Sequence, residues 1–149
     1  VIFFLTGILY IVYHYTHPPK KIILDRLNGI ITFPGIFYGK PITMPFDKVL
    51  PFLKFNGIGA SVSLGFCHHK ILATSIRIDN TPKSSWSFIV WYMDKNRPLP
   101  PGTAFDPYRE ADFQRRKAEG FPKPLYKSYI PTPEATRRQQ LERERIGKW

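Results

Sequence analysis

Hydrophobic and polar residues divide the chain into three stretches with different patterns. Residues 1–17 are mostly apolar and uncharged, residues 18–96 alternate short apolar runs with glycine and proline turns, and residues 97–149 are rich in proline and charge. An uncharged apolar run is typical of a membrane span, and short apolar runs between turns are typical of strands. The pattern therefore predicts a transmembrane helix at 1–17, a β-domain at 18–96 and a proline-rich, basic C-terminal arm at 97–149.

The first stretch has the features of the end of a membrane helix. Its tyrosines gather towards residue 15, where such rings prefer the headgroup layer, and Pro18 and Pro19 then end the helix. A full span needs about 20 apolar residues, so we expect this helix to be truncated at its start and further helices to be possible before Val1. A buried helix or strand of a soluble protein is the alternative, because a run this short fits both.

Positive charge directly after this stretch predicts its orientation. Lys20, Lys21 and Arg26 follow the apolar run, and basic residues beside a membrane helix favour the cytoplasmic side. We therefore expect the chain in the inner membrane with its bulk in the cytoplasm. These three side chains are the predicted contacts with the lipid bilayer surface.

The second stretch predicts a mainly β fold. Asn28 and Gly29 stand between two apolar runs, which is a strong hairpin signal. Residues 60–66 alternate apolar and small polar side chains, and residues 71–79 should pair back onto them. Residues 86–93 are read as the last and most hydrophobic strand. Together these runs predict one antiparallel sheet, or partly open barrel, of six to seven strands.

The C-terminal arm predicts one or two helices. Asp106 and Pro107 are a helix start and Gly120 is a stop, so a helix is expected near 106–119. A second, highly charged helix is expected near 134–145. Aromatic residues recur through 105–130, which should dock on the β-domain. Residues 134–149 hold too few apolar side chains to offset the entropy of ordering, so we expect them to order only on a partner.

The charge of the chain restricts the kind of partner. There are 22 basic and 11 acidic side chains, for a net charge of +11, and residues 101–149 carry 11 basic and 7 acidic ones. Because the excess is spread along the chain, a nucleic-acid-binding tail is not indicated. Anionic lipid headgroups and a protein partner, for which an acidic surface would be complementary, are both candidates, and positive charge beside an apolar segment can also report topology alone. The predicted contacts with the protein partner are Arg137, Arg138, Arg143 and Arg145.

Candidate chemistry is sparse along the chain. The single cysteine, Cys67, is followed by His68 and His69, but neighbours in a strand point to opposite faces and no further ligands have suitable spacing. No catalytic or phosphate-binding motif is present. We therefore predict no metal, no cofactor and no enzymatic activity. The alternative is an enzyme acting on membrane lipid or cell-wall intermediates through His68, His69 and Asp47.

Two short motifs resemble a known superfold. The pattern Asp25-Arg26-x-x-Gly29 and residues 42–49, with Phe46 where the motif has tryptophan, are similar to segments of bacterial, membrane-anchored pleckstrin-homology-like domains. With an apolar segment in front, the chain resembles uncharacterised proteobacterial membrane proteins linked to toxin secretion systems. This resemblance implies a PH-like sheet over about residues 20–120 and an immunity or adaptor function.

The functional expectation combines these features. The chain is predicted to be a membrane-anchored, non-enzymatic module that presents a basic β-domain to a protein partner. An immunity or adaptor protein for a secreted toxin is a narrower alternative within the same class, because a scaffold of this kind hosts many kinds of binding.

Overall fold

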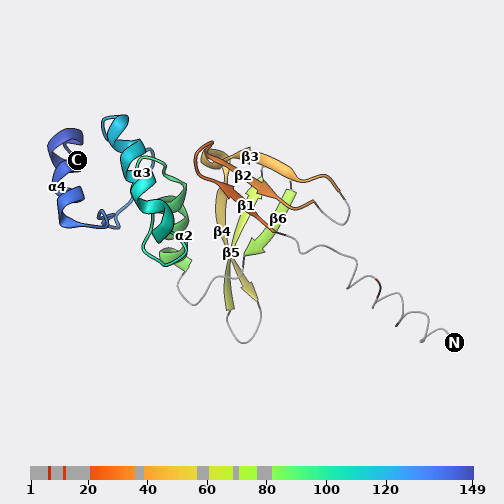
Figure 1. Ribbon diagram of the computed structural model, residues 1–149. Coiled ribbons are helices and arrows are strands. Elements are labelled where there is room, and N and C mark those ends of the chain that lie inside the picture. The colour runs from red at the N-terminus through yellow and green to blue at the C-terminus, as the bar shows by residue number, and fades with distance from the viewer. Residues whose placement is uncertain are drawn as a thin grey trace.

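The computed structural model describes residues 21–35, 39–56, 61–68, 71–76 and 82–149, together with Gly7 and Val12. Its strands are β1 (Ile23–Asp25), β2 (Ile30–Phe33), β3 (Ile42–Pro45), β4 (Leu50–Asn56), β5 (Ser61–His68) and β6 (Ile71–Ile76), with a 3-10 helix, η1 (Phe46–Lys48), between β3 and β4. Its helices are α2 (Pro82–Met93), α3 (Asp106–Ala118) and α4 (Arg137–Gly147). Figure 1 shows α2 beside the strands, with α3 and then α4 farther from them.

The first sheet has the order β1-β2-β3 and is antiparallel. β1 and β2 form the predicted hairpin, which is confirmed by the pairing of Asp25 with Ile30. Gly29 has φ +66°, a left-handed conformation that suits glycine. The Asp25 carboxylate closes the turn by accepting hydrogen bonds from the Asn28 backbone N–H at 3.1 Å and side-chain amide at 2.8 Å. An aspartate that bonds to the backbone of its own turn fixes the turn locally.

The second sheet has the order β4-β5-β6 and is also antiparallel. β4 pairs with β5 from Leu50 opposite Cys67 to Asn56 opposite Ser61. β5 pairs with β6, as the alternation of residues 60–66 predicted, with a register irregularity between Gly65 and Cys67. His68 ends β5, opposite Ile71.

The core lies between the first sheet and α2. Ile31 and Phe33 alternate with less buried neighbours along β2, so one face of this sheet is apolar. Beneath that face pack Ile89, Val90 and Met93 of α2, together with Met44, Phe46 and Val49. The rings of Trp86 and Tyr126 lie 5.6 and 5.1 Å from the ring of Phe46, between centroids. Tyr126 of the arm therefore completes the core.

Residues 86–93 form a helix, so the predicted final strand is wrong. They are the C-terminal two turns of α2, which begins at Pro82, a residue well suited to the first turn of a helix. Trp86, Ile89, Val90 and Met93 recur every three to four residues and face the core cluster, which is helical spacing. In a run that is apolar on nearly all sides, this spacing is hidden from a reading of the sequence.

The predicted fold class is therefore wrong in two respects. The described strands form two separate three-stranded sheets, not one PH-like sheet of six to seven strands, and the three helices hold slightly more residues than the six strands, so the described part is not β-rich. None of the helices in that part is long and apolar enough to cross a bilayer. Residues 1–17, where the transmembrane helix was expected, lie outside the described residues apart from Gly7 and Val12.

The end of the arm also differs from expectation. Residues 137–147 form α4 in the isolated chain, although they were expected to order only on a partner. Thr136 caps this helix by a reciprocal pair of 3.2 Å hydrogen bonds with Gln139, and the Trp149 indole donates to the Phe121 carbonyl at 2.8 Å. Buried polar contacts fix the helix in place of the apolar contacts whose scarcity suggested disorder.

Candidate functional site

α3 is held between clear start and stop signals. Asp106 lies in its first turn, where it accepts a hydrogen bond from Arg109 at 2.9 Å, with Pro107 next to it. Arg115, Arg116 and Lys117 fill the last turn, where cations favour the helix dipole. Gly120 then takes φ +75° and ends the helix. The basic last turn of α3 therefore faces the segment that leads into α4.

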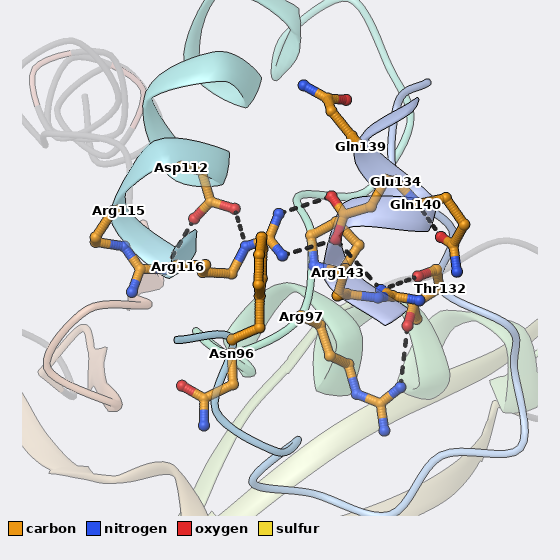
Figure 2. Close-up of polar contacts among 12 residues, drawn as sticks. Asn96, Arg97, Asp112, Arg115, Arg116, Thr132, Glu134, Gln139, Gln140 and Arg143 are labelled. Atoms are coloured by element: carbon orange, nitrogen blue, oxygen red, sulfur yellow. Dashed lines mark hydrogen bonds and ion pairs between the residues drawn. The ribbon is translucent and has the colours of Figure 1, made fainter. Parts of the chain in front are cut away.

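A buried cluster of Arg116, Glu134 and Arg143 joins α3 to α4 (Figure 2). Arg116 binds both carboxylate oxygens of Glu134 at 2.8 Å, and Arg143 donates to Glu134 at 3.3 Å and to the Thr132 carbonyl at 3.0 Å. The side chains of Arg116 and Glu134 are 1% and 2% exposed. Such a cluster is stable only while its charges remain matched.

The electrostatics of the two arginines differ. Burial by itself lowers the pKa of Arg116, but the hydrogen bonds and negative charges of Glu134 and Asp112 outweigh it and raise that pKa. Burial lowers the pKa of Arg143, and Glu134 offsets this only in part. Arg143 also lies over the Trp149 ring, 4.4 Å from its centroid. Its predicted role as a partner contact is corrected, because the guanidinium is enclosed by its own chain.

A second buried set of charges ties α2 to the hairpin and to the arm. Arg26 donates to the Tyr92 carbonyl at 3.0 Å, to the Arg97 carbonyl, and to Asp112 at 3.5 Å. Burial lowers the pKa of Arg26, with a partial offset from Asp112. Arg26 is 7% exposed, so its predicted place on a membrane surface is wrong. Lys21 is exposed, and Lys20 lies outside the described residues.

The remaining predicted arginines lie on the exposed side of α4. Arg137, Arg138 and Arg145 are all exposed, and the last two line a groove of about 540 Å³ between α3 and α4. We call this the α3–α4 groove. It is lined by Phe113, Gln114 and Lys117 from α3 and by Arg138, Leu141, Glu142 and Arg145 from α4.

The charge in the α3–α4 groove is unbalanced. Lys117 is paired with Glu142 across the groove at 2.6 Å. Within residues 82–149, neither Arg138 nor Arg145 has an ion pair of its own, and each contributes only its charge to the surroundings of Glu142. The lining thus holds three cations and one anion around Leu141, which is 56% exposed. This arrangement suits an acidic ligand with an apolar part.

Only Arg138 and Arg145 of the seven residues that line this groove were predicted as contacts from the sequence. Lys117, Leu141 and Glu142 were not singled out, although Leu141, Glu142 and Arg145 recur at helical spacing from Arg138 and so share a face of α4. That spacing could have revealed the α4 wall of the groove. Lys117 is brought to it by the tertiary packing of α3.

The pKa of Glu142 reports directly on the groove. The hydrogen bond from Lys117 is the main cause that lowers this pKa, and the charges of Lys117, Arg145 and Arg138 add to it. We expect Lys117→Gln to raise the pKa of Glu142 towards its ordinary value. Since the folded-state pKa is lowered, the pair stabilises the fold above the ordinary glutamate pKa, and this is lost as the pH falls through the lowered value.

A pH titration followed by NMR of the side-chain carboxyl carbons measures this shift. Lys148→Gln is the matched control, because Lys148 is an exposed cation at the C-terminal end of α4 that does not line the groove. An unchanged Glu142 pKa in Lys117→Gln would contradict the pairing across the groove.

Other candidate sites are less complete. A second groove of about 540 Å³ lies between the hairpin and α3, but its charged side chains Arg26, Asp112 and Arg115 are bonded to one another or to nearby backbone. Asp47, named with His68 and His69 as a catalytic alternative, is exposed on η1, and His69 lies outside the described residues. In the part of the chain that the structure describes, no group of histidine, cysteine, aspartate and glutamate side chains could hold a metal ion.

Comparison with known proteins returned no relative: no protein-family model, curated protein or solved structure matches the chain. The α3–α4 groove is therefore the feature of the chain that bears on its function.

Proposed function

We propose that the chain is a non-enzymatic protein-interaction module that binds its partner in the α3–α4 groove. The observation that carries this proposal is the pair of exposed, unpaired arginines, Arg138 and Arg145, on either side of the exposed Leu141. Apolar side chains and arginines at the centre of a surface hollow are typical of protein interfaces. Binding through this groove requires no membrane anchor.

The use of the carboxylates in the arm supports a binding role over a catalytic one. Acid–base catalysis needs a carboxylate positioned to exchange a proton with a substrate. The buried carboxylates Asp94, Asp112 and Glu134 are each bonded to arginine, so their charges stabilise the fold. Basic side chains outnumber acidic ones in the arm, and this net positive charge favours the attraction of an acidic partner.

Position-specific crosslinking in the producing cell tests the proposal. A photoreactive phenylalanine analogue is placed at Gln114 and, in a second variant, at Leu141, on opposite walls of the groove. The control position is Tyr129, which is fully exposed in the loop before α4 and lies outside the groove. We expect one and the same protein to be captured at both groove positions and not at Tyr129.

The captured protein, identified by mass spectrometry and purified, then allows a direct measurement. We expect Leu141→Asp to weaken its binding by about tenfold or more, because a charge replaces an apolar contact at the centre of the interface. Leu125→Asp is the matched control, since Leu125 is 53% exposed against 56% for Leu141 and lies outside the groove. Equal effects of the two substitutions, or capture that does not depend on position, would overturn the proposal.

A further inference from the structure

We infer that the occupant of the α3–α4 groove is an acidic segment of a protein that also carries an apolar side chain, and that Glu142 is a built-in competitor for it. This inference rests on the proposed function and specifies the partner's chemistry. It follows from the charges, the shape and the one ion pair of the groove.

Arg138 and Arg145 in the α3–α4 groove are complementary in charge to an acidic ligand. Every acidic residue from Asp106 to Glu144 already accepts a hydrogen bond or ion pair within the arm: Asp106 from Arg109, Glu110 from Gln139, Asp112 from Arg116, Glu119 from Arg115, Glu134 from Arg116, Glu142 from Lys117 and Glu144 from Gln140. None of these seven carboxylates forms an ion pair with Arg138 or Arg145. Carboxylates from another chain would supply the missing partners, and guanidinium groups bind carboxylates in a bidentate geometry.

The spacing of the two free arginines along α4 sets the spacing expected of the occupant's acidic side chains. Arg138 and Arg145 are two turns apart on one face, which is about 10 Å along the helix axis at about 1.5 Å per residue. Leu141 lies between them in the sequence of α4, and Phe113 of α3, which is only 3% exposed, also lines the groove. A matching occupant has two acidic side chains about 10 Å apart and an apolar side chain between them. Acidic residues seven apart on a helix, with an apolar residue three or four positions after the first, meet this requirement, because they share one face and rise about 1.5 Å per residue.

A nucleic acid fits these features less well. Bases would need an aromatic ring on which to stack, and the only ring in the lining is the buried Phe113. The single exposed apolar side chain, Leu141, suits an apolar protein side chain better than a base.

The ion pair between Lys117 and Glu142 indicates the competitor role of Glu142. Glu142 holds the Lys117 ammonium at 2.6 Å and lies near both free arginines. It therefore occupies the place that a partner carboxylate would take, and an incoming acidic segment must displace it. Removing its charge should strengthen binding. A merely structural ion pair would give no such gain.

Peptide selection provides the test. Random 16-residue peptides displayed on phage are selected on the full chain and counter-selected on the Arg138→Gln, Arg145→Gln double variant. We expect the enriched peptides to be acidic with an apolar residue between the acidic ones. Enrichment of basic or uncharged peptides, or of none that distinguishes the two proteins, would overturn the inference.

The affinity of the best enriched peptide is then measured for four variants. We expect the double variant to bind about tenfold more weakly and Glu142→Gln to bind about two- to fivefold more tightly, as for a solvent-exposed ion pair. The controls are an Arg137→Gln, Lys148→Gln double variant and Glu144→Gln, which make the same charge changes outside the groove lining and should leave the affinity unchanged. Weaker binding by Glu142→Gln, or equal changes in Glu142→Gln and Glu144→Gln, would refute the competitor role.

Two further results separate the possible failures. A single-stranded 16-nucleotide DNA that binds the groove more tightly than every selected peptide would overturn the inference in favour of a nucleic acid. A partner crosslinked at Gln114 and Leu141 through a segment without acidic residues would also overturn it, while the proposed function would stand. Absence of position-specific crosslinking defeats the proposed function itself.

Discussion

Glu134→Gln should lower the free energy of unfolding by about 3–5 kcal/mol, the usual cost of breaking a buried ion pair. The substitution keeps the shape of the side chain but removes the carboxylate that pairs with both Arg116 and Arg143. An amide N–H would also replace an oxygen that now accepts from one of these guanidiniums. The buried Arg143 would then have no ion-pair partner, and Arg116 would keep Asp112 alone. Urea denaturation measures the loss.

The effect should be concentrated at the contact between α3 and α4. Hydrogen exchange should show protected amides in residues 137–147 of the wild-type chain without any partner, and loss of that protection in Glu134→Gln. Glu144→Gln is the control, since Glu144 is exposed and only Gln140 donates to its side chain, at 2.6 Å. A Glu134→Gln protein within about 0.5 kcal/mol of wild type, the range of ordinary surface substitutions, would show that the buried cluster does not hold α4.

Features encoded by neighbouring residues could be predicted from the sequence. The hairpin at Asn28 and Gly29 depends on a glycine in the left-handed conformation and on an aspartate three residues before the amide it binds. α3 occupies residues 106–118, with Pro107 in its first turn and Gly120 after its end, because proline and glycine act on the backbone at their own positions. Both signals are local, so a sequence reading can detect them.

The fold of the apolar runs could not be read in the same way. In residues 86–93 apolar side chains occupy both strand-like and helix-like positions, so periodicity does not separate the two structures. The choice is made by packing, which places Ile89, Val90 and Met93 against the buried face of the first sheet. Each described strand pairs only with its neighbours in sequence, and the division into two sheets falls at η1, where β3 and β4 do not pair.

The order of the arm and half of the groove depend on long-range polar contacts. Residues 134–149 were expected to be disordered because they hold few large apolar side chains. Arg116 and Glu134 nevertheless meet across 18 positions in the sequence, and no local pattern signals that contact. The same reason explains the errors at Arg26 and Arg143, whose burial is decided by distant partners. Arg138 and Arg145 could be predicted as exposed because they lie on the open side of a charged helix.

Asp94→Asn should be the other strongly destabilising substitution, again by about 3–5 kcal/mol. Asp94 is fully buried, and one of its carboxylate oxygens accepts from Arg97 at 3.1 Å and from the Leu125 and Tyr126 backbone N–H groups at 2.9 and 3.2 Å. The other oxygen accepts from the Asn96 backbone N–H at 3.1 Å. In either orientation of the asparagine, its NH₂ group would face donors, and the buried Arg97 would lose its counter-charge.

The consequence should appear where the arm crosses the end of α2. Asp94 holds the amides of Leu125 and Tyr126, and Tyr126 packs its ring against Phe46 in the core. We therefore expect Asp94→Asn to expose these two amides to hydrogen exchange and to lower the urea midpoint, whereas Glu134→Gln should mainly affect α4. Asp106→Asn is the matched control. Asp106 pairs with Arg109 at 2.9 Å, but its side chain is 59% exposed, and exposed ion pairs contribute at most about 1 kcal/mol to stability. If Asp94→Asn cost no more than Asp106→Asn, the buried carboxylate would not be what fixes the arm to α2.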